Sequence, residues 1–178
     1  MFKIILKLLR VKYGKGLKLR GAPFIYRCKN GEITIGNNVT INSSFLSNLI
    51  GLYSRTIIIA RLDKSVIKIG NNVGISGATI YARERIEIGD NTLIGGNVKI
   101  LDNDFHPIDA DARIADDKTK IKTKAVLIGK NCFIGCNAII LKGTILGDNC
   151  VVGAGAVVSG IFKSNSVIVG NPARIIRE

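Results

Sequence analysis

Residues 128–158 read IGKNCFIGCNAIILKGTILGDNCVVGAGAVV, and a branched apolar residue returns at every sixth position. We number the six positions of the repeat from that residue. Position one in this stretch is held by Ile128, Ile134, Ile140, Leu146, Val152 and Val158. The same spacing recurs upstream at Ile88, Ile94 and Ile100, at Ile69 and Ile75, and at Ile35 and Ile41. A fixed short period of this kind is the signature of a repeat protein.

Position four of the repeat is asparagine or glycine in most copies, as at Asn131, Asn137 and Gly143. These two residue types adopt a left-handed backbone at low cost, so a turn is expected once in every repeat. Positions one and five then point inward, as the alternation of side chains along a strand requires. Strands this short bury their side chains only by stacking on copies of themselves, whereas a sandwich has no reason to keep the phase. The sequence therefore predicts an all-β solenoid, a parallel β-helix.

The repeat also sets the expected boundaries. Residues 1–28 are predicted to form a short helical or irregular cap, residues 29–160 the β-helix, and residues 161–178 a C-terminal segment. The register stops after Ile100 and resumes at Ile128, so residues 102–127 are predicted to leave the solenoid as a loop. Three repeats per coil would stack Cys132 on Cys150, which are 18 residues apart. We expect this pair to fill the core rather than to bind a metal, and we expect no metal site.

Composition narrows the class further. The chain has 178 residues, with 26 Lys and Arg against 13 Asp and Glu, a net charge of +13, and 47% hydrophobic residues. This is enough apolar material for one folded domain and excludes intrinsic disorder. No apolar run is long enough to span a membrane. The low aromatic content of 6% and the lack of a nucleic-acid-binding motif argue against nucleic acid as the partner of the positive charge.

The N-terminal stretch and the cysteines bear on location. The four cysteines form neither a zinc-ligand pattern nor a disulfide framework, which favours a reducing, cytoplasmic compartment.

At the N-terminus one helical face would carry the apolar residues Phe2, Ile5, Leu6 and Leu9. Two interpretations stay open for this stretch. It caps the open end of the solenoid, or it rests as a basic amphipathic helix on the inner face of a membrane.

The segment IGDNTLIGGNVKI (residues 88–100), the stretch 128–158 and the closing VGNPARIIRE (residues 169–178) resemble the hexapeptide-repeat acyltransferases. The nearest branch is that of the maltose, galactoside and surface-polysaccharide O-acetyltransferases. The resemblance implies a left-handed β-helix of triangular cross-section, a hand that periodicity alone does not give. It also implies a homotrimer with active sites between neighbouring subunits, and acetyl-CoA as cosubstrate.

The predicted loop contains the only histidine of the chain, His106, followed by Pro107. Catalytic groups are often found where a loop leaves a rigid scaffold. The resembling enzymes carry a catalytic histidine in a similar context. We therefore expect His106 to act as a general base that takes the proton of an acceptor hydroxyl. Backbone amides of a neighbouring coil would stabilise the oxyanion. Cys136 is the rival nucleophile, but no second histidine is there to activate it, so we expect direct transfer.

The residue that orients His106 is less sharply defined. Asp104 lies two residues earlier and would point to the same side in an extended segment, so it is the preferred partner. Asp102 and Asn103 are close rivals, and we expect these two to contact the substrate. Related enzymes sometimes use Asn or Asp from the coil below, where this chain offers only Ser76 and Glu84.

The cosubstrate groove is predicted from small residues and from the resemblance. The stretch 153–158 (GAGAVV) leaves room for a slender pantetheine arm, although small residues also suit tight turns. By resemblance the arm would be lined by Cys136, Ala154, Ser159 and Gly160. The nucleotide phosphates would meet Lys163, Arg174 and Arg177. A further basic run, Lys118, Lys120, Lys122 and Lys124, would form one charged face if it were a strand, attracting phosphates or an anionic membrane.

Taken together, the sequence predicts an acetyl-CoA-dependent O-acetyltransferase that modifies a sugar hydroxyl in surface polysaccharide biosynthesis. The acceptor would be a saccharide, free or linked to a nucleotide or a lipid. Two alternatives are N-acetylation of an amino sugar, since a histidine base serves an amine equally well, and a non-catalytic structural or binding solenoid.

Overall fold

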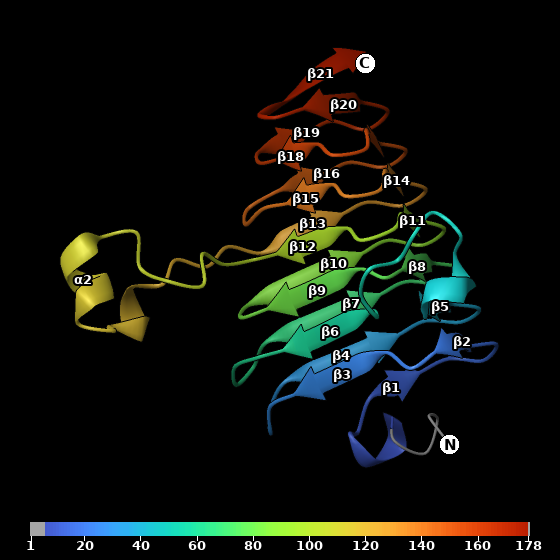
Figure 1. Cartoon of the computed structure of the whole chain (residues 1–178), viewed down its shortest axis with the longest axis horizontal. Coiled ribbons are helices and arrows are strands. Elements are labelled where there is room, and N and C mark those ends of the chain that lie inside the picture. Colours follow the sequence, from blue (N-terminus) through green and yellow to red (C-terminus); the bar gives the residue numbers. More distant parts are fainter. Residues whose placement is uncertain (1–5, 178) are drawn as a thin grey trace.

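The computed structural model describes residues 6–177, which wind into a prism with three faces (Figure 1). Each face is a sheet whose strands are parallel, except for the last strand of the second sheet. The first face contains β1 (Lys12–Tyr13), β4 (Glu32–Ile35), β7 (Val66–Ile69), β10 (Arg85–Ile88), β13 (Val126–Ile128), β16 (Ile145–Leu146) and β19 (Ile161–Phe162). The second contains β2 (Lys18–Gly21), β5 (Thr40–Ser43), β8 (Gly74–Ser76), β11 (Leu93–Ile94), β14 (Phe133–Ile134), β17 (Val151–Val152), β20 (Val167–Gly170) and β21 (Ala173–Arg177). The third contains β3 (Phe24–Arg27), β6 (Ile57–Ala60), β9 (Thr79–Ala82), β12 (Lys99–Leu101), β15 (Ile139–Ile140) and β18 (Val157–Val158).

The six-residue period of the sequence sets which residues of neighbouring strands lie side by side in these sheets. Ile88 pairs with Ile128 and Ile128 with Leu146, and position-one residues pair likewise on the other two faces. All of them are buried and belong to one continuous core. Because neighbouring parallel strands lie ~4.8 Å apart, each branched side chain packs on its copy one coil away. The predicted parallel β-helix is confirmed, and Cys132 and Cys150 are among its fully buried residues.

The turns lie where asparagine and glycine recur. Asn131, Asn137 and Asn149 have φ values of 56°, 60° and 60°, and Gly143 and Gly155 also have positive φ. On one corner the asparagine amides donate to one another up the stack, from Asn91 to Asn131 at 3.0 Å and from Asn131 to Asn149 at 3.1 Å. The left-handed turns predicted at position four are therefore confirmed.

Three edges run along the prism, and the functional residues are best located by them. The first edge joins face one to face two and includes residues 129–132, 147–150 and 163–166. The second edge joins face two to face three and includes residues 44–56, 95–98, 135–138 and 153–156. The third edge joins face three to face one and includes residues 61–65, 83–84, 102–125, 141–144 and 159–160.

The coils extend beyond the predicted β-helix at both ends. β1, β2 and β3 pair with β4, β5 and β6, inside the segment that was expected to be a cap, and β19 and β20 continue the coils past residue 160. The first coil has Gly14 and Gly16 at positions two and four, and Gly16 has a φ of 70°, but the aromatic Tyr13 occupies position one, so the run of branched apolar residues did not reveal this coil. Residues 6–8 are helical, and Leu6 is buried in the core at the open end, while Phe2 and Ile5 lie outside the described residues.

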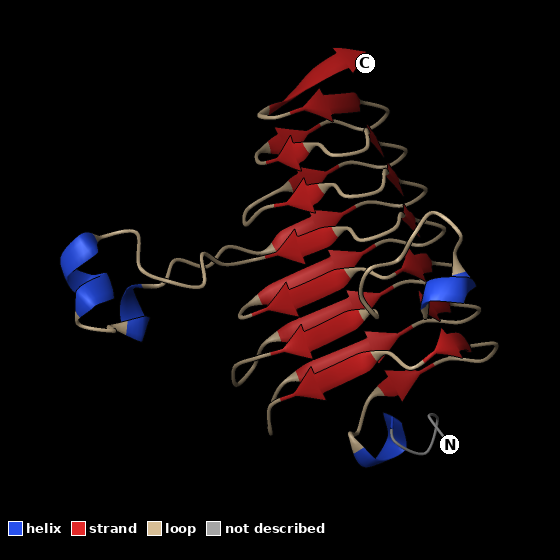
Figure 2. Cartoon of the chain, viewed as in Figure 1, coloured by secondary structure: helices blue, strands red, loops and turns tan. Residues whose placement is uncertain are grey.

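Helices occur only outside the coils in the described part of the chain (Figure 2). The loop after β12 carries α2 (Ala110–Ile114) and η2 (Lys118–Lys120), and Figure 1 shows it reaching far from the prism. A second excursion, residues 44–56 with η1 (Phe45–Ser47), lies against the second edge and was not predicted. At the C-terminus β21 folds back antiparallel on β20. None of the helices in residues 6–177 has the length and apolar character needed to cross a bilayer.

Candidate active site

The predicted loop leaves the prism at the third edge as a two-stranded stem, and we call residues 102–125 the arm. Asn103 and Thr123 form an antiparallel bridge across the stem. The amide of Lys124 donates to the carbonyl oxygen of Asp102 at 2.9 Å, and the amide of Asp104 donates to that of Lys122 at 3.2 Å. His106 lies just beyond this stem, so its backbone is held at the root of the arm, close to the rigid coils.

Asp102 fixes the root of the arm to the coil below. Its carboxylate is fully buried and accepts hydrogen bonds from the backbone amides of Arg83, Glu84 and Arg85 at 2.7–3.0 Å. Burial raises the pKa of this carboxyl, although the amide hydrogen bonds oppose the shift. The carboxylate is thus occupied by the protein itself. The structure gives Asp102 an anchoring task, and its predicted contact with a substrate stays a prediction.

A tight turn presents His106. The amide of His106 donates to the carbonyl oxygen of Asp104 at 2.7 Å, across Phe105 with a φ of 62°. A γ-turn with positive φ is rare and strained for a bulky residue, and such strain persists only where neighbours hold it. Asn103 supplies that support, because its side-chain oxygen accepts the Phe105 amide at 2.9 Å. Asn103 is buried, so it serves the turn, and its predicted substrate contact is likewise untested.

The same turn keeps the Asp104 carboxylate from pairing with the His106 imidazole. That hydrogen bond was predicted for an extended segment, and the chain forms a γ-turn there instead. Instead the carboxylate of Asp104 accepts a hydrogen bond from the ammonium of Lys142 at 2.5 Å. Its second oxygen is buried without a partner. Lys142 lies on the third edge one coil above, so this ion pair ties the start of the arm to the coil that follows it. No side-chain hydrogen bond joins Asp104 to His106 within residues 6–177.

His106 is exposed and opens into a cavity of about 260 Å³ at the third edge. Tyr81 and Phe105 form an aromatic pair in its wall, with ring centroids 4.9 Å apart and planes inclined at 52°. The cationic wall residues are Arg61, Arg83 and Lys118, and Asp116 pairs with Lys118 at 3.2 Å. An imidazole beside a polar cavity can exchange a proton with a bound hydroxyl, which is the chemistry of a general base.

Cys136 and Ala154 lie together on the second edge, in a largely apolar cavity of about 360 Å³. Its floor includes glycines that have no room for a side chain: a Cβ on Gly135 would come within 2.5 Å of the Ala154 amide nitrogen. We call this cavity the furrow, and its apolar lining suits a flexible apolar chain. Cys132, by contrast, is buried in the core, and burial raises the pKa of its thiol to about 11. Such a thiol is protonated at neutral pH and is no nucleophile.

The other predicted cosubstrate residues lie elsewhere on the chain. Ser159 and Gly160 are on the third edge and Lys163 on the first, while Arg174 and Arg177 are exposed on β21. The structure therefore brings Cys136 and Ala154 together but spreads the remaining residues over several sides of the prism. One chain alone does not gather them around one ligand.

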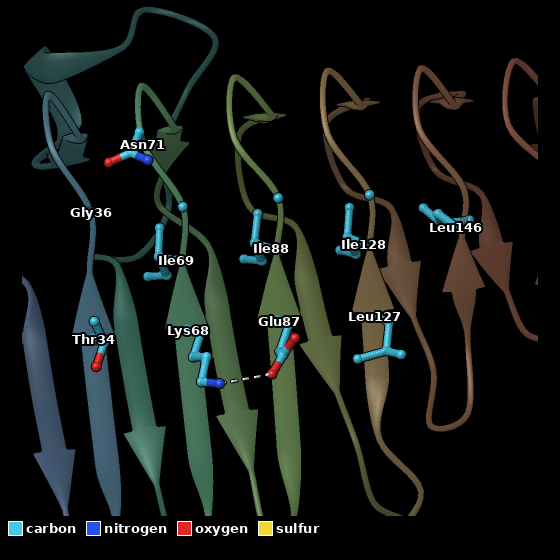
Figure 3. Close-up of a pocket in the computed structure, with 13 residues that line it drawn as sticks. Thr34, Gly36, Lys68, Ile69, Asn71, Glu87, Ile88, Leu127, Ile128 and Leu146 are labelled. Carbon is cyan, nitrogen blue, oxygen red and sulfur yellow. Dashed lines mark ion pairs between the residues drawn. The ribbon is translucent and has the colours of Figure 1, made fainter.

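Two further features differ from expectation or lie apart from these residues. The lysine run is not a strand: Lys118 and Lys120 belong to η2, so no single basic face forms. A groove over the first face, drawn in Figure 3, follows the glycines after β4, β7, β10 and β13. Lys68 and Glu87 pair in it at 3.4 Å. It contains none of the predicted site residues.

Sequence reasoning did not find Lys142, Arg61, Arg83 or Tyr81. Each was passed over because it follows the repeat as an ordinary outward residue. A usable signal was present for the arginines, since both directly follow strands of the third face and would stack at one corner.

Comparison with known proteins agrees with this architecture. Residues 125–160 match a family model described as the hexapeptide repeat of succinyl-transferase. The proposed lipopolysaccharide biosynthesis O-acetyl transferase WbbJ of Escherichia coli K12 is 32% identical over 162 residues, covering 86% of this chain and 75% of WbbJ. A maltose O-acetyltransferase from Clostridium difficile 630 is 27% identical with a TM-score of 0.54, covering 99% of this chain and 73% of that one. A mutant of AntD, an N-acyltransferase from Bacillus cereus solved with dTDP and coenzyme A, shares the fold at 22% identity and a TM-score of 0.75, covering 99% and 88% of the two chains.

Proposed function

Because the chain belongs to the hexapeptide-repeat acyltransferase superfamily, we propose that it transfers an acetyl group from acetyl-CoA to a sugar hydroxyl in surface polysaccharide biosynthesis. It is an acyltransferase built on a left-handed parallel β-helix, and acetyl-CoA is its cosubstrate. The observation that carries the finer proposal is the placement of His106, the only histidine, exposed in a cavity at the root of a strained and well-anchored turn.

His106 is the general base in this proposal. A sugar hydroxyl has a pKa far above 7 and attacks poorly unless its proton is removed as the new bond forms. A neutral imidazole can take that proton as the bond forms. The hydroxyl oxygen then bonds to the acetyl carbon, the carbon–sulfur bond breaks, and the imidazolium returns the proton to the leaving sulfur. The proton leaves the hydroxyl and ends on the sulfur of CoA, and the electron pair of the broken carbon–sulfur bond stays with that sulfur, so no acyl-enzyme is needed.

Asp104 and Lys142 act as positioning residues for this base. Their ion pair holds the stem of the arm against the coil above, and Asp102 and Asn103 hold it against the coil below and within the turn. A base held by rigid neighbours loses less freedom when the substrate binds.

Acetyl-CoA supplies an activated acetyl thioester, and the second-edge cavity fits its slender arm. Cys136 and Ala154 border this cavity, together with the glycines Gly95, Gly96, Gly135 and Gly153. Lys163, Arg174 and Arg177 are exposed cations near the C-terminal end of the prism, where phosphate groups would find them. We propose these residues as the cosubstrate site, with Ser159 and Gly160 bordering it from a neighbouring chain.

A homotrimer follows from the separation of these parts. His106 is on the third edge, whereas Cys136 and Ala154 are on the second edge of the same prism. If the third edge of one chain faces the second edge of the next, the base and the cosubstrate furrow meet. Such a contact is heterologous, and three copies close it into a ring.

The acceptor chemistry is tested by measuring release of free CoA with paired sugars that differ only in hydroxyl or amine at one carbon. We expect turnover of the hydroxy sugar, with a mass gain of one acetyl group on oxygen. AntD acts as an N-acyltransferase, which makes an amino sugar the alternative acceptor. Turnover of the amino sugar alone would replace O-acetylation by N-acetylation.

A bulky residue in the furrow should weaken cosubstrate binding. Ala154 is exposed, so Ala154→Trp leaves the core unchanged while filling the space beside Cys136. We expect the KM for acetyl-CoA to rise by about tenfold or more, with a smaller change in the KM for the acceptor. Steady-state kinetics with Lys29→Trp, at an exposed corner of the N-terminal coil, provide the control. Equal effects of the two substitutions would place the cosubstrate elsewhere.

We further propose that the enzyme works in the cytoplasm, where reduced cysteines and acetyl-CoA are both expected. Contact with a membrane surface stays a secondary proposal. In its favour, Lys7, Arg10, Lys15 and Lys18 are exposed at the N-terminal end of the prism, and the first acidic residue of the chain is Glu32. Against it, Leu6 points into the core and serves as a cap.

A further inference from the structure

We infer that the acceptor sugar carries a negative charge close to the hydroxyl that reacts, and that Arg61 and Arg83 bind this charge. The inference rests on the proposed function and concerns the cavity at His106. It names a chemical class of acceptor, an anionic sugar, whose charge is either a carboxylate on the ring or a phosphate attached to it.

The first observation is the stacking of the two arginines. Ala60 pairs with Ala82 in the third face, and the amide of Arg61 donates to the carbonyl oxygen of Ala82 at 2.8 Å. Arg61 and Arg83 therefore leave the sheet at the same corner of adjacent coils, where strands lie ~4.8 Å apart. Two positive charges at one corner of adjacent coils repel each other, and an anion bound between them would relieve that repulsion.

The second observation is that this charge is not balanced by the chain. Within residues 6–177 neither guanidinium takes part in an ion pair, and Nε of Arg83 is buried without a hydrogen-bond partner. The carboxylates nearby are engaged by other groups: Asp102 with backbone amides, Asp116 with Lys118, Asp104 with Lys142, and Asp63 with Asn30. Glu84 is exposed and does not line the cavity. Nε itself is closed to the cavity, so a ligand there would bind the terminal nitrogens of the two guanidinium groups, which form strong charge-assisted hydrogen bonds with an anion.

The third observation is the shape and composition of the cavity. Its volume of about 260 Å³ is at the small end for a ligand site, which suits one sugar ring rather than a long chain. The Tyr81–Phe105 pair offers an aromatic wall for the apolar face of that ring. His106 lines the same cavity, so a charge on the arginines and a hydroxyl at the imidazole belong to one small molecule.

Acetyl-CoA is the other source of anionic groups, and geometry disfavours it here. The phosphates of CoA are separated from the thioester by the whole pantetheine arm. A group within the cavity of the base therefore lies near the reacting thioester rather than near those phosphates. The guanidinium forks fit carboxylate and phosphate equally well, so the two acceptor anions are distinguished by experiment.

The test compares three probes: methyl glucoside, which is neutral, methyl glucuronide, which carries a carboxylate, and glucose 1-phosphate. Binding is measured by calorimetry in the presence of CoA, and acetyl transfer by release of CoA. We expect at least one anionic probe to bind about 10- to 100-fold more tightly than the neutral one. The Arg61→Met and Arg83→Met variants should lose this preference without weaker binding of methyl glucoside. The anion that shows the preference identifies the source of the charge.

Arg85→Met is the matched control, because Arg85 lies on the same chain segment as Arg83 but pairs with Glu87 outside the cavity. Thermal melting of each variant verifies folding. Two results would overturn the inference: equal binding of neutral and anionic probes, or arginine variants that bind CoA more weakly and the sugars unchanged. Binding is read without turnover. If the anionic probes bind more tightly through the arginines but no acetyl group is transferred, the proposed function is refuted and this inference stands. If acetyl groups are transferred but the anionic probes bind no more tightly than the neutral one, this inference is refuted and the proposed function stands.

Discussion

Replacing His106 by alanine is expected to lower kcat for acetyl transfer by about 10²- to 10⁴-fold, the usual contribution of a general base. The KM for acetyl-CoA should change little, because the residues proposed to hold the cosubstrate, such as Cys136 and Ala154, are unchanged in this variant. His106 is exposed, so the variant should fold and melt like the parent. Release of CoA, followed at saturating substrates, measures the effect.

Cys136→Ser is the control that separates a base from a nucleophile. If transfer is direct, this variant should keep kcat within a factor of about three, and no acetyl group should remain on the protein after denaturation. Mass spectrometry of the denatured enzyme shows any acyl-enzyme. Full activity of His106→Ala together with loss of activity in Cys136→Ser would reverse the assignment of the two residues.

The second large effect is expected on stability. Asp102→Ala removes a buried acceptor and leaves the amides of Arg83, Glu84 and Arg85 without partners. Each unpaired buried donor costs free energy, and we expect the free energy of unfolding to fall by roughly 3–5 kcal/mol. For a chain of this size that corresponds to a drop in Tm of roughly 10 °C. The arm should also become more mobile, so activity should fall below what unfolding explains.

Asp148→Ala is the matched control for Asp102→Ala. Asp148 is an exposed corner aspartate whose carboxylate accepts the amide of Lys130 at 2.7 Å, and its loss leaves that amide open to water. Its cost should stay within about 1 kcal/mol. Calorimetric melting of both variants measures the difference. Similar Tm values for the two would show that burial of the Asp102 carboxylate contributes nothing to the fold.

The β-helix was predictable because one six-residue pattern repeats along the chain. A residue such as Ile134 packs on its own copies at Ile94 and Val152, so the period and the three-dimensional register are the same pattern. The turns at Asn131 and Asn149 follow from a local backbone preference. Neither feature depends on contacts between unlike parts of the chain, which is why the sequence alone reveals both.

The site was only partly predictable because it depends on contacts that the repeat does not encode. The break in the register located the arm and His106. The ion pair of Asp104 with Lys142 joins two coils through outward side chains, and nothing periodic marks it. The positive φ of Phe105 replaces the extended segment that was assumed between Asp104 and His106. The excursion at residues 44–56 was not predicted because the repeat is weak there, so no clear break in the register marked it.

The claim that each active site takes His106 from one chain and the cosubstrate furrow from another is tested by mixing two impaired variants, assayed at an acetyl-CoA concentration well below the parental KM, where Ala154→Trp also loses most of its activity. His106→Ala and Ala154→Trp chains are co-expressed in equal amounts, and acetyl transfer by the mixed assembly is measured. Under random assembly we expect recovery of about a quarter of the parental activity, since each site needs one intact partner from each variant. Activity no higher than that of the two variants assembled separately would contradict the claim and place the whole site within one chain.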